Sequence, residues 1–322
     1  MTSDHRVLVI TSVPDQIGPI LTARFPDLPI RIEDDADKVA SVLDEFRPSV
    51  VFAIGGEPYP KNRFPDLLAY PSVRWLSNGG AGVEHIGTWD PAQKTVTNAA
   101  GVNAPFLAQF TIAAHMSANI GMPRYARQQQ ARQWERHEWP PLTDRKFCVV
   151  GLGSIGRLVA QHAKYFGMRT VGTRSTARPT DHVDEVFASK DLLKALDGAE
   201  FVSVHCASTP ETAGIIDDAA FDAMADGVIF LNAARGAVVD EDALRRALDS
   251  GKIGTAILDV FRTEPLPRDN PLWDYENVIV TPHMADSISG WEVNLTRAFG
   301  DNLARWIAGD PLASLVDPAR GY

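Results

Sequence analysis

The sequence predicts an α/β protein built from two doubly wound domains, each with a parallel sheet between helices. From Lys146 onward, short apolar strands alternate with segments of helical period, the pattern of a parallel sheet covered on both faces. A glycine-rich turn, Gly151-x-Gly153-x-x-Gly156, follows one of these strands and opens a helix. The first hundred residues repeat the pattern on a smaller scale, and 322 residues suffice for two cores.

The first hundred residues contain three expected strands and one expected helix. Short apolar runs predict strands at Val7–Ile10, Val50–Ile54 and Val73–Leu76. Between the first two strands, apolar side chains recur at helical spacing over Ala36–Phe46. The third strand leads into the glycine-rich turn at 79–82, where the backbone can approach a ligand closely.

A long helix is predicted over Pro105–Ile120, with Asn103 as its cap and a proline tolerated in its first turn. This helix is apolar on most faces, so we expect it to be buried between domains or subunits. The following segment, Gly121–Pro141, is rich in Arg, Gln and Trp and is predicted to be extended or irregular.

The second half of the chain alternates strand and helix to about residue 286. Strands are expected at Lys146–Val150, Arg169–Thr173, Glu200–His205, Gly227–Leu231, Gly254–Val260 and Asn277–Val280. Helices are expected at Ser154–Phe166, Lys190–Leu196, Asp217–Met224, Asp240–Asp249 and, last, Ser287–Ala308.

Composition excludes several function classes. The net charge of −10 disfavours nucleic acid as a partner, because phosphate binding needs a basic face. No apolar stretch approaches the ~20 residues of a membrane helix, and no secretory signal is apparent, so a cytoplasmic location is expected. Cys148 and Cys206 lie in apolar strand-like runs without metal-ligand spacing, which predicts buried reduced thiols and no metal site.

Three ionisable side chains each follow a predicted strand between residues 227 and 286. They are Arg235 in Asn-Ala-Ala-Arg-Gly, Glu264 in Glu-Pro-Leu-Pro, and His283 in Thr-Pro-His. A guanidinium can clamp a carboxylate bidentately, and a histidine oriented by a carboxylate can exchange a proton near neutral pH. The sequence therefore predicts an acid/base site with an anion clamp. The alternative roles are a structural arginine, a solvated loop acid and a half-buried histidine.

These motifs, in this order and spacing, resemble those of the D-2-hydroxyacid dehydrogenases, from about residue 50 to about 310. The resemblance implies two Rossmann-like or flavodoxin-like domains with an active-site cleft between them. Residues 1–100 and 287–322 would form the substrate-binding domain, and residues 101–286 the dinucleotide-binding domain. It also implies a homodimer that uses the helix after Pro105 and an arm around Trp134 and Trp139.

In the glycine loop, the first glycine permits the tight turn, the second admits the pyrophosphate and the third lets the helix pack on the strand. The amides of Ser154 and Ile155 would face the phosphates. About 20 residues further on, where NAD enzymes carry an acidic residue, this chain has Arg174. We therefore expect preference for NADP(H), with NAD(H) still possible. The residues expected around the 2′-phosphate are Arg174, Ser175, Thr176 and, more loosely, Arg178. The alternative is a solvated loop with two ordinary arginines.

The resemblance assigns further cofactor contacts. The loop at Cys206, Ala207, Ser208 and Thr212 matches the one that lies over the cofactor in the family. Asp259 and the carbonyl of Ala233 match groups that hold the nicotinamide carboxamide.

By the same resemblance, the reaction is hydride transfer to a small 2-oxo acid of the glyoxylate or hydroxypyruvate type, giving the D-2-hydroxy acid. Arg235 would bind the substrate carboxylate, and His283, oriented by Glu264, would protonate the carbonyl oxygen. The amides of Ala81 and Gly82 would also meet the carboxylate. Two alternatives stay open. One is a reductase of larger 2-oxo acids. The other is a dinucleotide-sensing corepressor-like scaffold, less favoured because no disordered tail is expected.

Overall fold

The computed structural model describes residues 5–55 and 58–318, and the chain divides into two compact units. Unit 1 comprises residues 1–103 and 289–322, and unit 2 comprises residues 104–288. The junctions lie a few residues from those that the sequence analysis places at 100/101 and 286/287.

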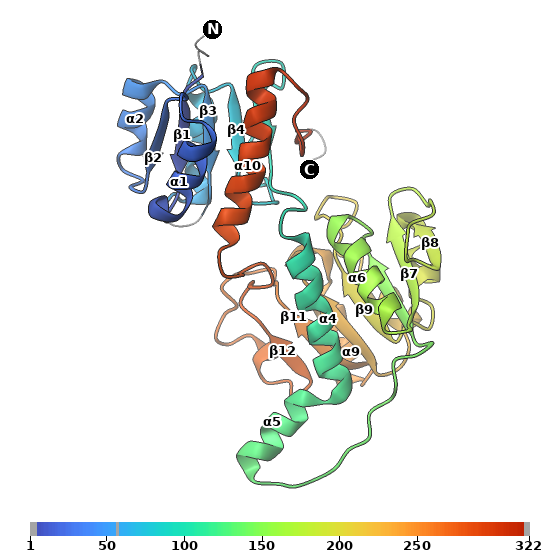
Figure 1. Ribbon diagram of the computed structural model, residues 1–322. Helices are drawn as coiled ribbons and strands as arrows, with labels where there is room; N and C mark the ends of the chain where they lie inside the picture. The colour runs from blue at the N-terminus through green and yellow to red at the C-terminus, as the bar shows by residue number, and fades with distance from the viewer. Residues whose placement is uncertain (1–4, 56–57, 319–322) are drawn as a thin grey trace. The chain divides into compact units, whose positions relative to one another are not determined.

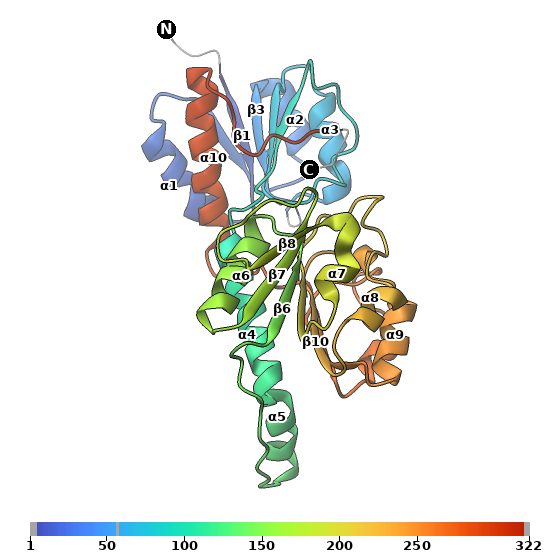
Figure 2. The ribbon, with the colours of Figure 1, turned by 90° about the vertical axis from the view of Figure 1, so that its right-hand side faces the viewer.

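Unit 1 is built on a five-stranded parallel sheet with the order β2-β1-β3-β4-β5 (Figure 1). Helices α1 and α10 cover one face of the sheet, and α2 and α3 cover the other (Figure 2). The strands are β1 Val7–Ile10, β2 Ile30–Glu33, β3 Val50–Ala53, β4 Trp75–Asn78 and β5 Thr95–Thr97. The helices are α1 Pro14–Arg24, α2 Val39–Phe46, α3 Phe64–Ala69 and α10 Trp291–Ala308, with a short 3-10 turn η1 Lys61–Arg63.

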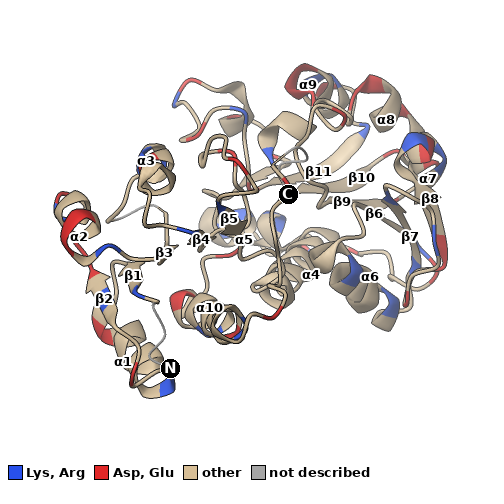
Figure 3. Cartoon of the chain, turned by 90° about the horizontal axis from the view of Figure 1, so that it is seen from above, with Lys and Arg blue, Asp and Glu red and all other residues tan. Residues whose placement is uncertain are grey.

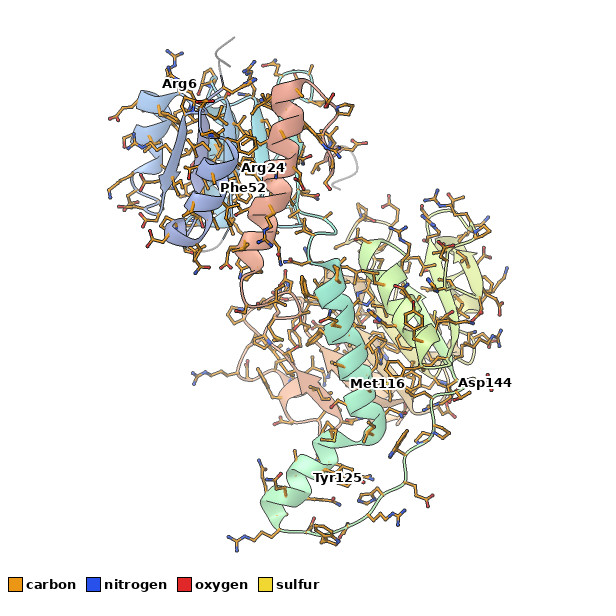
Figure 4. All side chains as sticks on the ribbon, in the orientation of Figure 1. Arg6, Arg24, Phe52, Met116, Tyr125 and Asp144 are labelled. Carbon is orange, nitrogen blue, oxygen red and sulfur yellow. The ribbon has the colours of Figure 1, made fainter. Side chains whose placement is uncertain are left out.

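Helix α10 returns from the end of the chain to complete the core of unit 1. The ring of Phe299 on α10 stacks on Phe52 of β3, with centroids 4.5 Å apart. At the helix surface, Arg24 of α1, which is labelled in Figure 4, forms an ion pair with Asp301 of α10 at 2.8 Å. Because buried aromatic pairs contribute more than exposed ion pairs, the stacked rings fix α10 on the sheet.

Unit 2 is built on a seven-stranded parallel sheet with the order β12-β11-β10-β9-β6-β7-β8. Helices α4 and α6 cover one face, and α7, α8 and α9 cover the other (Figure 2). The strands are β6 Lys146–Val150, β7 Arg169–Arg174, β8 Glu185–Ala188, β9 Phe201–Val204, β10 Val228–Asn232, β11 Ile253–Leu258 and β12 Val278–Val280. The helices are α4 Ala104–Ile120, α5 Met122–Ala131, α6 Ser154–Tyr165, α7 Leu192–Leu196, α8 Asp218–Ala223 and α9 Glu241–Asp249, with 3-10 turns η2 Ser189–Asp191, η3 Gly236–Val238 and η4 Pro271–Trp273.

Within unit 2, an arm of residues 121–143 connects the end of α4 to the start of β6 (Figure 4). Its first half is the helix α5, so the prediction of an extended or irregular segment is wrong for residues 122–131. Arg, Gln and Ala are good helix formers, and Pro123 lies in the first turn, where proline is tolerated. The hydroxyl of Tyr125 donates to the carbonyl of His137, which ties the two halves together at 3.2 Å.

The predicted fold class is confirmed, since both units are parallel sheets between helices. Helix α1, strand β2, helix α3, strand β5 and strand β8 were not expected from the sequence. Asn103 does not cap α4, because its side-chain oxygen has no hydrogen-bond partner among the described residues. Cys206 is only half-buried, whereas Cys148 is fully buried as expected, and both are free thiols.

Charged side chains are distributed unevenly over the helices and strands. Helix α9 carries both acidic and basic residues (Figure 3), whereas the strands β9 and β10 carry none. No helix in the described ranges combines the length and apolar character needed to cross a membrane.

Candidate active site

The carboxyl ends of three neighbouring strands in unit 2 bring the predicted catalytic residues together. Strands β10, β11 and β12 are adjacent and parallel, so the loops that follow them leave the same edge of the sheet. Arg235 follows β10, Glu264 follows β11 and His283 follows β12.

Glu264 and His283 form a hydrogen-bonded pair. The Nδ1 atom of His283 lies 2.7 Å from Oε2 of Glu264, and the amide of Phe261 donates to Oε1 at 2.9 Å. Burial alone would raise the pKa of Glu264, but hydrogen bonds from His283 and Phe261 and nearby positive charge outweigh it and lower that pKa. An ionised Glu264 accepts the proton on Nδ1. The other ring nitrogen, Nε2, makes no hydrogen bond within the described residues and can serve a ligand.

The loop that carries His283 is anchored by Asp259, which is 1% exposed. His283 has a left-handed backbone with φ of 49°, and its amide donates to the carbonyl of Asp259 at 2.8 Å. The Asp259 carboxylate accepts hydrogen bonds from the Thr281 hydroxyl, the Met284 amide and the Ala285 amide, at 2.5, 2.9 and 3.1 Å. Sequence reasoning missed this role, because it depends on β11 and β12 being neighbours.

Arg235 lies in a turn that Asn232 and Gly236 shape. The side chain of Asn232 donates to the carbonyl of Arg235 at 3.1 Å and accepts from the amide of Ala234 at 3.1 Å. A Cβ on Gly236 would lie 2.0 Å from the backbone of Phe261, so only glycine fits. The charge of Arg235 contributes to the lowered pKa of Glu264, which places the guanidinium near the acid/base pair.

The glycine loop between β6 and α6 has the steric properties that a dinucleotide site requires. A Cβ on Gly151 would lie 2.5 Å from the amide nitrogen of Cys206, and one on Gly156 would lie 2.1 Å from the carbonyl oxygen of Gly151. At Gly153, by contrast, no heavy atom of the described residues lies within 4 Å of such a Cβ. The first and third glycines are therefore needed for packing, and the second leaves open space beside the start of α6. Ser154 and Ile155 form the first turn of that helix, where free amides favour an anion.

Arg174 ends β7 beside this loop, because the loop is tied to β7 by hydrogen bonds from Gly151 and Leu152 to Thr173. Burial, followed by the like charges of Arg178 and Arg157, lowers the pKa of Arg174. None of these three arginines forms an ion pair with a carboxylate in the described part of the chain.

Sequence reasoning missed two members of this group, Arg157 on α6 and Thr180. The hydroxyl of Thr180 accepts from Arg174 at 3.3 Å. The position of Arg157 directly after Gly156, on the first turns of α6, is the signal that could have found it. Ser175 and Thr176 are exposed in the bend after β7.

The loop after β9 contains the other predicted cofactor contacts. Thr212 closes this loop, since its hydroxyl donates to the carbonyl of Ala207 at 2.6 Å and accepts from the amide of Thr209 at 2.8 Å. Cys206 lies against Gly151, and burial raises the pKa of its thiol to about 11. Ala233 is half-buried between β10 and Arg235. In unit 1, Ala81 and Gly82 lie in the turn that follows β4.

Comparisons with known proteins were made for the whole chain. Residues 112–285 match the family model of the D-isomer specific 2-hydroxyacid dehydrogenase, NAD binding domain. A structure of a D-isomer specific 2-hydroxyacid dehydrogenase family protein from Aeromonas salmonicida is 29% identical, covers 98% of this chain and all of that one, and has a TM-score of 0.86.

Two of the similar proteins are named as reductases of glyoxylate. The structure of an NADPH-dependent glyoxylate/hydroxypyruvate reductase from Sinorhizobium meliloti, in complex with NADP and sulfate, is 25% identical with a TM-score of 0.82, covering 99% of this chain and 100% of that one. A glyoxylate reductase from Korarchaeum cryptofilum is 32% identical over 258 residues, which is 77% of each chain. This chain spans about half the length of the D-3-phosphoglycerate dehydrogenases that it also matches.

Proposed function

Because the chain belongs to the D-isomer specific 2-hydroxyacid dehydrogenase family, we propose that it is an NADP(H)-preferring oxidoreductase of small 2-oxo acids. Its substrate is of the glyoxylate or hydroxypyruvate type, and the product is the D-2-hydroxy acid. The prediction of the family from the sequence motifs is confirmed; the substrate and the cofactor preference are our proposals.

The observation that carries the proposal is the His283–Glu264 pair at the carboxyl edge of the unit 2 sheet, 2.7 Å between Nδ1 and Oε2. An ionised Glu264 keeps the proton of a neutral imidazole on Nδ1 and stabilises the imidazolium. In the reductive direction, the protonated ring donates from Nε2 to the carbonyl oxygen of the 2-oxo acid. In the oxidative direction, Nε2 accepts the proton of the hydroxyl group.

The remaining residues bind and orient the reactants. Arg235 binds the substrate carboxylate with its planar fork, beside the acid/base pair. Ala81 and Gly82 offer backbone amides to the same group. The bound nicotinamide cofactor supplies or accepts the hydride. The glycine loop, with Ser154 and Ile155, holds the pyrophosphate of the cofactor. Ala233, Asp259 and the loop that follows β9 are proposed to hold its nicotinamide end.

Preference for NADP(H) is supported by the arginine group at the end of β7. Arg174 and its neighbours Arg157 and Arg178 have no carboxylate partner within the described residues, so a 2′-phosphate would supply the missing negative charge. A carboxylate at this position would favour the 2′-hydroxyl of NAD instead. The Sinorhizobium meliloti reductase is described as NADPH-dependent. NAD(H) is the second, weaker cofactor.

A reductase of larger 2-oxo acids is the second candidate. Met284 follows His283 directly and is 37% exposed in the loop that carries the catalytic histidine. An exposed, flexible apolar side chain at this place can adapt to a longer substrate.

We further propose a homodimer that forms through the arm of residues 121–143. Trp134 and Trp139 are 101% and 50% exposed, and Met122 is 51% exposed. Large apolar side chains gathered on one projecting segment are typical of a protein interface.

Loss of reduced-nicotinamide absorbance tests the reaction, with NADPH and NADH compared on glyoxylate, hydroxypyruvate, pyruvate, phenylpyruvate and 2-oxoisocaproate. We expect the highest kcat/KM with NADPH as the cofactor and glyoxylate or hydroxypyruvate as the substrate. Highest turnover with phenylpyruvate or 2-oxoisocaproate would favour the second candidate. Tight NADPH binding without turnover of any of the five acids would contradict the enzyme proposal and favour a dinucleotide-sensing scaffold.

Replacing Arg174 by Asp tests the cofactor preference. The change introduces the carboxylate that binds the ribose 2′-hydroxyl and repels a 2′-phosphate, so the ratio of kcat/KM for NADPH over NADH should fall by about tenfold or more. Lys164→Gln, at the other end of α6, is the control for loss of a positive charge. An unchanged ratio in Arg174→Asp would refute the role of this arginine.

A further inference from the structure

In the turn at residues 79–82 of unit 1, the carbonyl groups of Gly80, Ala81 and Gly82 accept hydrogen bonds from the same unit. The side-chain nitrogen of Asn78 donates to the carbonyls of both Gly80 and Gly82, each at 2.9 Å. The side-chain nitrogen of Asn98 donates to the carbonyl of Ala81 at 2.8 Å. Three consecutive carbonyl oxygens are therefore held by two asparagines.

The amide groups of the same turn are not engaged in this way. Gly79 donates to the carbonyl of Ala53 at 2.8 Å, but Gly80, Ala81 and Gly82 donate to no acceptor in the described part of the chain. Gly80 and Ala81 are exposed and Gly82 is half-buried, so a ligand can reach this segment. A turn with occupied carbonyls and free amides presents partial positive charge and favours an anion.

Asn78 is suited to hold the turn in this conformation. It is the last residue of β4 and is 1% exposed, so its amide group cannot exchange its partners for water. Its two acceptors are carbonyl oxygens, so the NH2 end of the amide must face the turn. A Cβ on Gly79 would lie 2.8 Å from the side chain of Ile54, and glycine thus lets the turn lie close to the end of β3.

We propose that Asn78, assisted by Asn98, is a positioning residue for substrate binding. By holding the carbonyls of Gly80, Ala81 and Gly82, the two side chains keep the amides of the turn available to the carboxylate of the 2-oxo acid. This inference rests on the proposed function, because it takes the ligand of the turn to be that carboxylate.

Two substitutions remove the donors of Asn78 in different ways. Asn78→Asp keeps the shape of the side chain and replaces the donor by an acceptor, and Asn78→Ala removes the group without adding charge. The matched control is Lys94→Met, because Lys94 also donates to two backbone carbonyls of unit 1, those of Tyr70 and Val73, at 2.7 and 2.6 Å. Tyr70 and Val73 precede β4, whereas Asn78 ends it.

The KM for glyoxylate, the KM for NADPH, kcat and the unfolding midpoint are measured for each variant. Binding of oxalate, which carries carboxylates and does not react, is measured by calorimetry on the enzyme saturated with NADPH. In both Asn78 variants, we expect the KM for glyoxylate to rise by about tenfold or more and the affinity for oxalate to fall by about tenfold or more. The KM for NADPH should not change. Asn98→Ala, which loses one neutral bond, should raise the KM by about threefold. Lys94→Met should lower the unfolding midpoint and leave both KM values unchanged.

Separate results test the inference and the function on which it rests. If the wild-type enzyme reduces glyoxylate and the Asn78 variants keep its KM and oxalate affinity while losing stability, Asn78 is merely structural and the inference is wrong. If Lys94→Met raises the KM as much as Asn78→Ala, the effect is a general loosening of unit 1, and the inference is again wrong. If the wild-type enzyme neither reduces a 2-oxo acid nor binds oxalate, the proposed function and the inference both fail.

Discussion

Two histidines of unit 2 differ in nearly every respect that matters for chemistry. His283 lies at the carboxyl edge of the sheet, its side chain is 42% exposed, and its Nδ1 atom is paired with Glu264. His115 lies on α4 with no exposed surface, its ring meets Phe147 and Phe201 edge-on, and neither ring nitrogen has a partner among the described residues. The first ring can gain a proton with a carboxylate beside it, and the second is held neutral.

This difference shows that the surroundings of a histidine, and not its presence, decide its role. Burial and the nearby His205 lower the pKa of His115 to about 3, and burial lowers that of His205 to about 4. His205 is half-buried as a whole, yet its Nδ1 atom is fully buried, and its Nε2 atom contacts the Ser203 hydroxyl at 2.7 Å. The interior pair therefore affects stability at low pH, whereas His283 is placed to affect turnover.

The largest expected effect is on activity, in His283→Asn. Asparagine tolerates the left-handed backbone at this position but cannot exchange a proton, so kcat/KM should fall by about 10²–10⁴-fold. Steady-state kinetics with glyoxylate and NADPH measure this, and NADPH affinity and the unfolding midpoint should stay near those of the wild type.

His182→Asn is the matched control for this change. His182 is also exposed, has a positive φ of 61° and contacts a polar side chain, Gln161, at 3.0 Å. It should keep full activity. Equal losses in the two variants, or near-normal turnover in His283→Asn, would remove His283 from the mechanism.

The second effect concerns stability in acid and belongs to the interior pair. A pKa lowered from 6.5 to about 3 means that the unfolded chain binds a proton at His115 which the folded chain does not. Stability is thus undiminished above pH 6.5 and falls as the pH drops below it, by roughly 2 kcal/mol at pH 5 for this residue. Denaturant unfolding at pH 7 and pH 5 measures the loss.

His115→Phe should reduce this pH dependence, because the variant has no group to titrate. The aromatic neighbours Phe147 and Phe201 suit a third apolar ring, and two unpartnered polar atoms are lost, so stability at pH 7 should rise or stay the same. A variant as sensitive to pH between 7 and 5 as the wild type would show that His115 is not the source. Activity at pH 7 should not change.

The fold was predictable where the pattern was strong. Continuous apolar runs identified β1, β6 and β10, since buried parallel strands need no polar face. Helix α1 was not predicted, because its sequence contains Gly18 and Pro19, and both residue types are ordinary signals for a turn. Strand β8 was not predicted, because it is a short, partly buried strand at the edge of the sheet, where it pairs with β7.

The part of the candidate site that could be predicted consists of ionisable side chains that directly follow predicted strands. His283 and Glu264 are brought together as their motifs imply, and Arg235 lies near them. The supporting contacts were not predictable, because they join distant segments. Asp259 holds the loop of His283 across 25 and 26 residues of sequence, to the amides of Met284 and Ala285. Asn78 and Asn98 carry no motif, and only the hydrogen bonds of the turn reveal them.

The smaller of the two expected effects on turnover belongs to Glu264→Gln, which separates the orientation of His283 from proton transfer. The amide oxygen of glutamine can still accept from Nδ1 of His283, but the negative charge that stabilises the imidazolium is lost. We expect kcat/KM at pH 7 to fall by about 10–100-fold, less than in His283→Asn. Because its pKa is lowered, Glu264 contributes stability above its usual value of 4.5 and loses it as the pH falls below that value. The Glu264 side chain is 35% exposed, so in Glu264→Gln the free energy of unfolding at pH 7 should change by less than about 1 kcal/mol.

Glu241→Gln is the control for Glu264→Gln, because it removes a carboxylate that accepts from the Arg262 amide at 3.0 Å, and it should keep its activity. A Glu264→Gln enzyme as inactive as His283→Asn would mean that the carboxylate itself transfers the proton, and one as active as the wild type would mean that the pair only orients the loop.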